Sequence, residues 1–167
     1  MVKFNISLEL DAKVLRDVAI KAFEEDRVKY GSMPPGIETL EWHLSKVRNG
    51  MYYKIILENR IIGGINLYNL GSGHFKLGAI FIEPEYQNQG IGTKAIDFIQ
   101  NTYPHIKRWS LDTPYQNYKN HNFYERQGYV KVDEIKPVED IDFWLFEYVK
   151  EIKNSMTNDN LNLLNKE

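Results

Sequence analysis

The sequence predicts a single mixed α/β domain in which strands and helices alternate through the middle of the chain. First, the 167 residues are 43% apolar, enough for one packed core and too few for two domains of ordinary size. Second, some apolar runs follow a strand pattern, whereas others recur with helical spacing. Third, short polar turns join neighbouring strand-like segments, which is typical of antiparallel hairpins. We expect the domain over residues 1–150 and a polar tail over residues 151–167.

The N-terminal third predicts one strand and two helices. Val2–Ile6 alternates as a strand does, and the apolar residues between Val14 and Phe23 have helical spacing behind Asp11, a plausible N-cap. Residues 31–36 hold two prolines, which interrupt regular structure. The spacing over Ile37–Val47 predicts a second helix that ends near residue 50.

The middle of the chain predicts three strands, a helix and a further strand. Met51–Leu57 and Ile61–Tyr68 form a hairpin around a short polar turn, and Phe75–Ile82 follows as a third strand. Apolar residues then recur with helical spacing directly after Gly90. Trp109–Thr113 is a short strand that leads through a polar loop into another helix.

The C-terminal part predicts a closing antiparallel pair formed by Tyr129–Ile135 and Ile141–Val149. Residues 151–167 are rich in Asn and Lys, so we expect a frayed helix or disorder there.

Composition excludes several function classes. The net charge of -2 provides no excess of positive charge for nucleic acid or an anionic membrane, so we expect neither as a partner. Without cysteine, the chain has no disulfide, thiolate metal site or cysteine nucleophile. The four histidines show no ligand spacing, so we expect no metal. The N-terminus lacks the pattern of a signal sequence, which predicts a cytoplasmic protein.

The stretch Ile80–Thr93 is the most informative part of the sequence, since a buried strand runs into a glycine-bearing loop and then a helix. Backbone N–H groups at a helix start lack intrahelical partners and the macrodipole is positive there, so a pyrophosphate can bind without arginine. A lone G-x-G also fits an ordinary strand-to-helix junction. The loop matches neither the nucleoside-triphosphate-binding glycine motif nor the dinucleotide fingerprint.

Two segments together carry a family resemblance. Gln87–Gly92 is similar to the acyl-CoA signature Q/R-x-x-G-x-G/A of the GNAT N-acetyltransferases. Leu111–Thr113, Asn117 and Asn122–Tyr129 resemble the later segment of that family, except that Asn120 stands where the family usually has a small residue. The resemblance covers the chain nearly to residue 149. It implies a mostly antiparallel sheet, flanked by helices, that splays open between its fourth and fifth strands, with coenzyme A in the gap.

The resemblance also implies site residues. Tyr124 is the candidate acid that protonates the departing thiolate, with a core tyrosine as the alternative, and Asn117 either binds the pantetheine arm or caps a helix. The third strand of the middle region is implied to offer backbone groups to pantetheine, and the loop to bind the pyrophosphate. The implied cofactor-binding residues are Ile80, Phe81, Ile82, Gln87, Asn88, Gln89, Gly90, Ile91, Gly92, Thr93, Asn117 and Tyr124.

Acetyl transfer to an amine needs a neutral amine, although an alkyl amine is largely protonated at pH 7. We expect Glu83 to act as the general base, with His74 and Asp112 as alternatives. In this family the acceptor usually contacts the first two helices and their loop, here residues 23–42. Glu24, Glu25 and Asp26 would suit a cationic amine, although an acidic helix end is more often simply solvated. The remaining candidates in this segment are Tyr30 and Trp42.

The resemblance thus predicts an acetyl-CoA-dependent N-acetyltransferase that acts on a small-molecule or peptide amine without an acyl-enzyme intermediate. Aminoglycosides, polyamines, amino acids and protein N-termini all stay open as acceptors. The alternative is a non-catalytic acyl-CoA-binding sensor on the same fold. A structural module without coenzyme A leaves both glycines and the spacing from Asn117 to Tyr124 unexplained. Family members are often dimers, which leaves a homodimer open.

Overall fold

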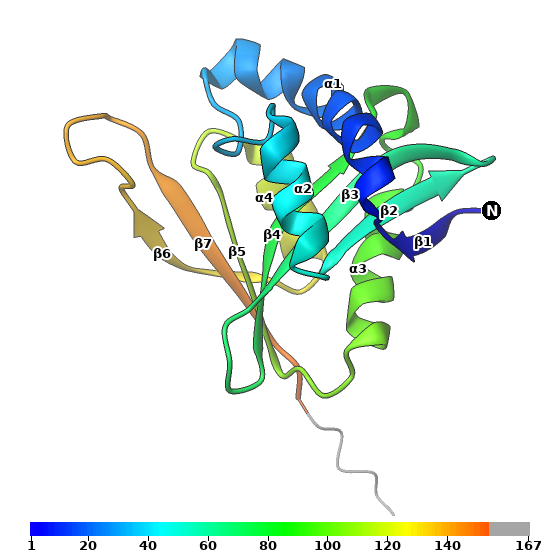
Figure 1. Ribbon diagram of the computed structural model, residues 1–167. Helices are drawn as coiled ribbons and strands as arrows, with labels where there is room; N and C mark the ends of the chain where they lie inside the picture. The colour runs from blue at the N-terminus through cyan, green and yellow to red at the C-terminus, as the bar shows by residue number, and fades with distance from the viewer. Residues whose placement is uncertain (154–167) are drawn as a thin grey trace, which may run out of the picture.

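The computed structural model describes residues 1–153 and contains one seven-stranded sheet with the order β1-β2-β3-β4-β5-β7-β6 (Figure 1). Neighbouring strands are antiparallel except for β4 and β5, which are parallel. This confirms the predicted mixed, mostly antiparallel fold. The strands are β1 (Lys3–Ile6), β2 (Tyr52–Leu57), β3 (Arg60–Asn69), β4 (His74–Ile82), β5 (Arg108–Pro114), β6 (Val130–Ile135) and β7 (Leu145–Glu151).

Helices pack on the sheet over two buried apolar clusters. One cluster joins α1 to β2 and the end of β4, and it contains Leu15, Tyr52 and Phe81. The other joins α3 to β3, β4 and β5, and it contains Ile99 and Trp109. The helices are α1 (Ala12–Tyr30), α2 (Leu40–Arg48), α3 (Ile91–Thr102) and α4 (Tyr118–Arg126), with short 3-10 turns η1 (Glu9–Asp11) and η2 (Pro84–Tyr86).

The predicted hairpin is present, and its turn is shorter than expected. Glu58 and Asn59 both have positive φ, 49° and 63°, as a two-residue turn between twisted antiparallel strands requires. Arg60, which the sequence placed in the turn, is the first residue of β3.

Several element boundaries differ from the predicted ones. Ile37 was assigned to a helical face, but α2 begins at Leu40 because the Thr39 hydroxyl accepts the Trp42 N–H and caps the helix there. Asp11 precedes α1 as predicted, yet its side chain does not cap α1 and instead accepts the Leu8 N–H at 2.8 Å.

The C-terminal strand also differs from the prediction. It begins at Leu145 and not at Ile141, and it extends through Glu151, where we expected the tail to start. At this end of the strand, Glu151 pairs with Arg108 at 2.7 Å. The predicted frayed or disordered character of the tail falls mostly on residues 154–167, which lie outside the described residues.

A β-bulge in β4 changes which residues face which helix. Asn66 pairs with Ala79 but Leu67 pairs with Leu77, so Gly78 is an extra residue in β4. Before the bulge, Leu77 packs in the α3 cluster, and after it, Ala79 packs in the α1 cluster. A side chain at this glycine would not fit, because an ideal Cβ would lie 2.3 Å from a ring carbon of Tyr68.

Strands β4 and β5 separate soon after they meet. The parallel ladder joins only His74–Lys76 to Arg108–Ser110. Beyond these pairs, the facing edges of Leu77–Ile82 and Leu111–Pro114 have no ladder hydrogen bonds to each other within the described residues. The sheet is therefore open between its fourth and fifth strands, as predicted. Among the helices of residues 1–153, none has the length and apolar character needed to cross a membrane.

Candidate active site

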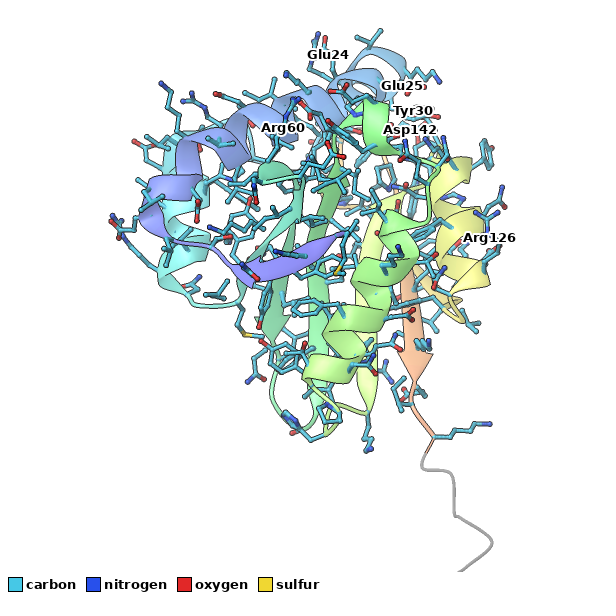
Figure 2. All side chains as sticks on the ribbon, turned by 90° about the vertical axis from the view of Figure 1, so that its right-hand side faces the viewer. Glu24, Glu25, Tyr30, Arg60, Arg126 and Asp142 are labelled. Carbon is cyan, nitrogen blue, oxygen red and sulfur yellow. The ribbon has the colours of Figure 1, made fainter. Side chains whose placement is uncertain are left out.

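The opening between β4 and β5 continues into a cavity of about 650 Å³. Its walls are the C-terminal half of α1 and the loop over residues 31–38, the separated parts of β4 and β5, one face of α4, and the connection between β6 and β7. Figure 2 shows Tyr30, at the end of α1, on the same side of the molecule as Asp142 of that connection. Residues far apart in the sequence therefore surround one volume.

Tyr124 lies in this cavity wall and is 6% exposed. Burial is the main cause that raises the pKa of its phenol above the ordinary value, and neighbouring Tyr129 adds to it. The phenol is therefore neutral at physiological pH and is able to donate a proton, but it is a poor base.

The N-terminus of α4 positions Tyr124. Asn117 precedes the helix, and its side-chain oxygen accepts the Asn120 N–H at 3.1 Å, so the predicted N-cap is present. Asn117, Asn120 and Tyr124 are spaced three and then four residues apart, which places them on one helix face. The Asn120 amide donates to the Thr113 hydroxyl at 3.3 Å, so this unusual residue ties α4 to β5.

Asn117 also links α4 to α1 across the opening. Its side-chain Nδ2 donates to Asp26 Oδ2 at 3.1 Å. Asp26 is half-buried and lines the cavity; desolvation chiefly, and then the charge of Glu25, raise its pKa above the ordinary value. The side chain predicted to bind pantetheine thus already bonds a carboxylate.

An ion pair spans β4 and β5 where the two strands separate. Lys76 Nζ lies 2.6 Å from Asp112 Oδ2, and both residues line the cavity. Two residues earlier in each strand, His74 Nε2 lies 2.6 Å from the Ser110 hydroxyl, where the strands are still paired. Of the two alternative general bases, Asp112 lines the cavity that holds Tyr124, whereas His74 is not among its lining residues.

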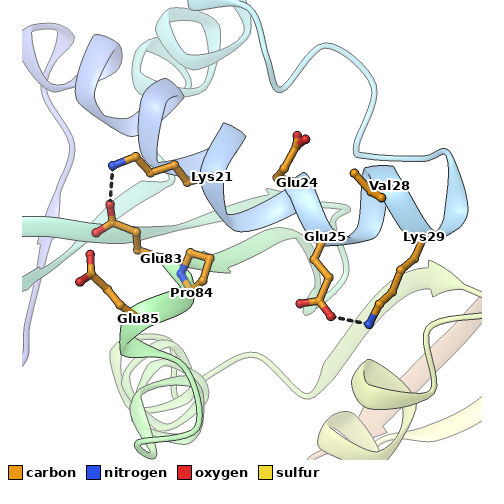
Figure 3. A pocket seen from close by; sticks show the side chains of 8 residues that line it. All are labelled: Lys21, Glu24, Glu25, Val28, Lys29, Glu83, Pro84 and Glu85. Carbon is orange, nitrogen blue, oxygen red and sulfur yellow. Dashed lines mark hydrogen bonds and ion pairs between the residues drawn. The ribbon is translucent and has the colours of Figure 1, made fainter.

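Glu83 lies elsewhere. Its carboxylate is 2% exposed and accepts hydrogen bonds from Arg60 Nη2 at 2.9 Å to each oxygen and from Lys21 Nζ at 3.1 Å. It lines a separate open groove between α1 and η2 (Figure 3). The structure does not bring Glu83 and Tyr124 to the same cavity, and Glu24 and Glu25 line the groove with Glu83.

The glycine loop ends in the N-terminus of α3. Gly90 is the N-cap with φ of 79°, and an ideal Cβ there would meet no atom within 4 Å. The first N–H groups of α3 have no intrahelical acceptors, so they are available to an anion. The missing Cβ of Gly92 also leaves room for the Phe123 ring, which lies 3.0 Å from the ideal Cβ position.

These features fit an acyl-CoA. Unpaired edges of β4 and β5 offer amide partners to pantetheine, and the α3 N-terminus suits a pyrophosphate. Ile80 lines the cavity, while Phe81 packs its side chain into the α1 cluster and leaves only its backbone for a ligand. Contacts of individual loop residues with a ligand stay predictions. Within the described residues, no group of three or more His, Asp or Glu side chains is arranged to hold a metal ion.

The model of the acetyltransferase (GNAT) family matches residues 15–129, more than half of the chain. The chain belongs to the GNAT acetyltransferase family. The predicted resemblance is therefore confirmed.

Solved structures share the fold of this GNAT protein. The PaiA N-acetyltransferase of Thermoplasma acidophilum, solved in complex with coenzyme A, has a TM-score of 0.76 and 18% identity over 91% of this chain and 99% of its own. An acetyltransferase from Thermus thermophilus has a TM-score of 0.75 and 18% identity over 91% of this chain and 97% of its own. At these identities the likeness shows the fold.

A curated relative, the uncharacterised protein YrkN of Bacillus subtilis, is 36% identical over 73 residues. The match spans 43% of this GNAT chain and 40% of the relative.

The sequence did not predict three parts of the site. The Lys76–Asp112 pair depends on the register of β4 and β5, and the role of residues 137–145 as a cavity wall depends on the path of a connection. Asp26 was grouped with the acidic end of a helix, but its contact with Asn117 joins residues 91 positions apart. No local pattern signals any of these three features.

Proposed function

We propose that this GNAT protein transfers the acetyl group of acetyl-CoA directly to a primary amine of a small molecule or peptide. The single observation that carries the proposal is the position of Tyr124, a buried neutral phenol in the cavity where β4 and β5 separate. Direct attack is favoured because the chain has no cysteine to form an acyl-thioester with the enzyme.

In the reaction, the nitrogen lone pair of the acceptor forms a bond to the thioester carbonyl carbon, and the carbon–sulfur bond then breaks. Tyr124 donates its phenolic proton to the leaving thiolate, and the proton lost by the amine restores the phenol through a base or water. The position of Tyr124 in the cavity wall supports this role. Burial raises the pKa of the phenol and makes it a weaker acid, so the proton moves only as negative charge develops on the sulfur.

For the base we propose Asp112, in preference to our expectation of Glu83. Asp112 shares a cavity with Tyr124, and its carboxylate is held at the strand opening by Lys76, whose Nζ lies 2.6 Å from Asp112 Oδ2. Glu83 is held by Arg60 and Lys21 in another groove. That arrangement supports a structural role for Glu83.

The cavity lining supports an acceptor that arrives as a cation. Asp26, Glu38 and Asp112 contribute three carboxylates, whereas Lys76 is the one basic residue among the described residues that line it. Phe23 and Phe143 add apolar surface. An amine on a partly apolar body matches this combination of charge and surface.

The proposal is tested by isothermal titration with acetyl-CoA, using wild type, Gly90→Glu and the control Gly50→Glu. Both glycines have nearly equal positive φ, 79° and 76°, and open space around an ideal Cβ, so both variants carry similar backbone strain. Only Gly90→Glu places a negative charge at the α3 N-terminus. We expect saturable binding by wild type and the control, and its loss in Gly90→Glu; no binding by folded wild type contradicts the proposal.

A further inference from the structure

One face of α4 packs along the glycine loop and the first turn of α3. Lys119 Nζ donates to Gln87 Oε1 at 3.0 Å, and the Phe123 ring occupies the space above Gly92. One turn further along, Gln127 Nε2 donates to the Thr93 hydroxyl at 3.0 Å. Lys119, Phe123 and the C-cap residue Gln127 are four positions apart, so they form one continuous stripe along α4. This stripe places the Lys119 ammonium group at the loop that precedes α3.

The glycine loop lacks a positive charge of its own. No Lys or Arg occurs between Lys76 and Lys94, whereas Glu83 and Glu85 are both acidic. The signature position that is either Gln or Arg in the family pattern is Gln87 here. The only cation that could add to the backbone N–H groups of α3 at this loop therefore comes from another element of the fold.

Lys119 is suited to supply that cation. It is exposed, and no carboxylate oxygen within residues 1–153 lies within 4.0 Å of its Nζ, so its charge is not cancelled by an ion pair. The carboxylates of Glu25 and Asp26 act on it only at longer range, and their direct partners are Lys29 and Asn117. An ammonium group carries three N–H donors, and Gln87 uses one of them.

We infer that Lys119 is a phosphate ligand of the acyl-CoA site, which binds the pyrophosphate from the start of α4. Gln87 is the positioning residue, because its Nε2 donates to the Ile82 carbonyl at 2.8 Å while its Oε1 holds the lysine. Lys119, 32 positions after Gln87, thus supplies the positive charge that an arginine supplies at the signature position in other family members. The uncharged Gln87 at that position holds the lysine in place. This inference rests on the proposed use of acetyl-CoA.

The test compares acetyl-CoA affinities by isothermal titration for wild type, Lys119→Met, Lys119→Arg and the double variant Gln87→Arg/Lys119→Met. We expect Lys119→Met to weaken binding about tenfold or more, since a hydrogen bond to a charged group is lost. Lys119→Arg should bind nearly as wild type does, and the double variant should recover most of the affinity. Lys107→Met, an exposed lysine far from the loop, is the matched control and should change nothing.

A second ligand separates the two kinds of phosphate. For 3′-dephospho-acetyl-CoA, which keeps the pyrophosphate, Lys119→Met should weaken binding by the same factor as for acetyl-CoA. A loss confined to acetyl-CoA overturns the assignment to the pyrophosphate, and equal affinities of wild type and Lys119→Met overturn the inference altogether. Failure of wild type to bind either ligand counts against the proposed function instead, so the two failures are distinguishable.

Discussion

Lys76 Nζ lies 2.6 Å from Asp112 Oδ2 at the last point where β4 and β5 are neighbours. Beyond it, the strands diverge around the cavity that holds Tyr124. A candidate acid and a candidate base therefore line one volume. The pair is only partly exposed, so it is screened less by water than an ion pair on the open surface.

The first prediction separates Asp112 from Glu83. Asp112→Asn should lower kcat by about 100-fold or more, because it removes the proposed base, and leave the affinity for acetyl-CoA nearly unchanged. Steady-state kinetics and isothermal titration measure the two effects.

Glu83→Gln serves as the comparison. It leaves the charges of Arg60 and Lys21 without their buried partner, so it should lower the free energy of unfolding while preserving kcat in the folded fraction. The reverse pattern, in which Glu83→Gln abolishes turnover and Asp112→Asn does not, restores Glu83 as the base.

The second prediction concerns Tyr124→Phe. The substitution keeps the ring in its buried place but removes the phenolic proton, so kcat should fall about 100-fold at unchanged acetyl-CoA affinity. An acyl-donor thioester with a more acidic leaving thiol should narrow the difference in kcat between wild type and Tyr124→Phe, since its thiolate needs less protonation. Equal kcat for wild type and Tyr124→Phe makes the tyrosine a core residue only.

The third prediction concerns the cap of α4. Asn117→Ala removes the side-chain acceptor of the Asn120 N–H and should lower the free energy of unfolding by about 1 kcal/mol. Asn117→Ser keeps an N-cap oxygen but loses the donor to Asp26, so its stability should stay near that of wild type. Denaturant unfolding measures both, and equal losses would show that the cap is not the dominant contribution.

The fourth prediction concerns pH. His43 is fully buried; its Nε2 donates to the Ile37 carbonyl at 2.7 Å, which leaves Nδ1 to accept from the Tyr52 hydroxyl at 2.8 Å in the neutral ring. Burial chiefly lowers its pKa below the ordinary 6.5. As the pH falls, the imidazole therefore takes up a proton in the unfolded chain before it does so in the folded chain. The contribution of neutral His43 to the free energy of unfolding is complete above pH 6.5 and is lost as the pH falls below that value.

The check is urea unfolding at pH 7.5 and 5.5 for wild type and His43→Gln. Wild type should lose stability at the lower pH, and the variant should lose less, whatever its absolute stability. Identical pH dependence in both proteins shows that another group controls the effect. Because Ile37 lies in the loop over residues 31–38, protonation of His43 should also loosen that loop at low pH.

The sequence predicted those parts of the site that lie in short stretches of chain. The glycine loop, Asn117 and Tyr124 were indicated by two short motifs that carry the family resemblance, and the hairpin was indicated by two strand-like runs around a short polar turn. The start of α2 at Leu40 was not predicted, because the apolar spacing extends back to Ile37 whereas the N-cap is Thr39.

The features that escaped prediction depend on register and on long-range contacts. The bulge at Gly78 exchanges the face of β4 that packs on α1 with the face that packs on α3. No pattern of apolar residues in the sequence indicates this exchange. Asp112 reaches Lys76 only because the parallel ladder places Lys76 beside Ser110. We expected Glu83 to act as the general base, and no local pattern indicates that Arg60 of β3 and Lys21 of α1 bind its carboxylate.

The most direct test of the account is the release of coenzyme A thiol from acetyl-CoA by wild-type protein, measured with and without a panel of primary amines. The account predicts release that depends on the amine, saturates with it, favours cationic acceptors and yields one N-acetylated product per thiol. Tight binding of acetyl-CoA without amine-dependent release of thiol across the panel would contradict the proposed acetyltransferase activity. It would instead support the alternative of a non-catalytic acyl-CoA-binding sensor.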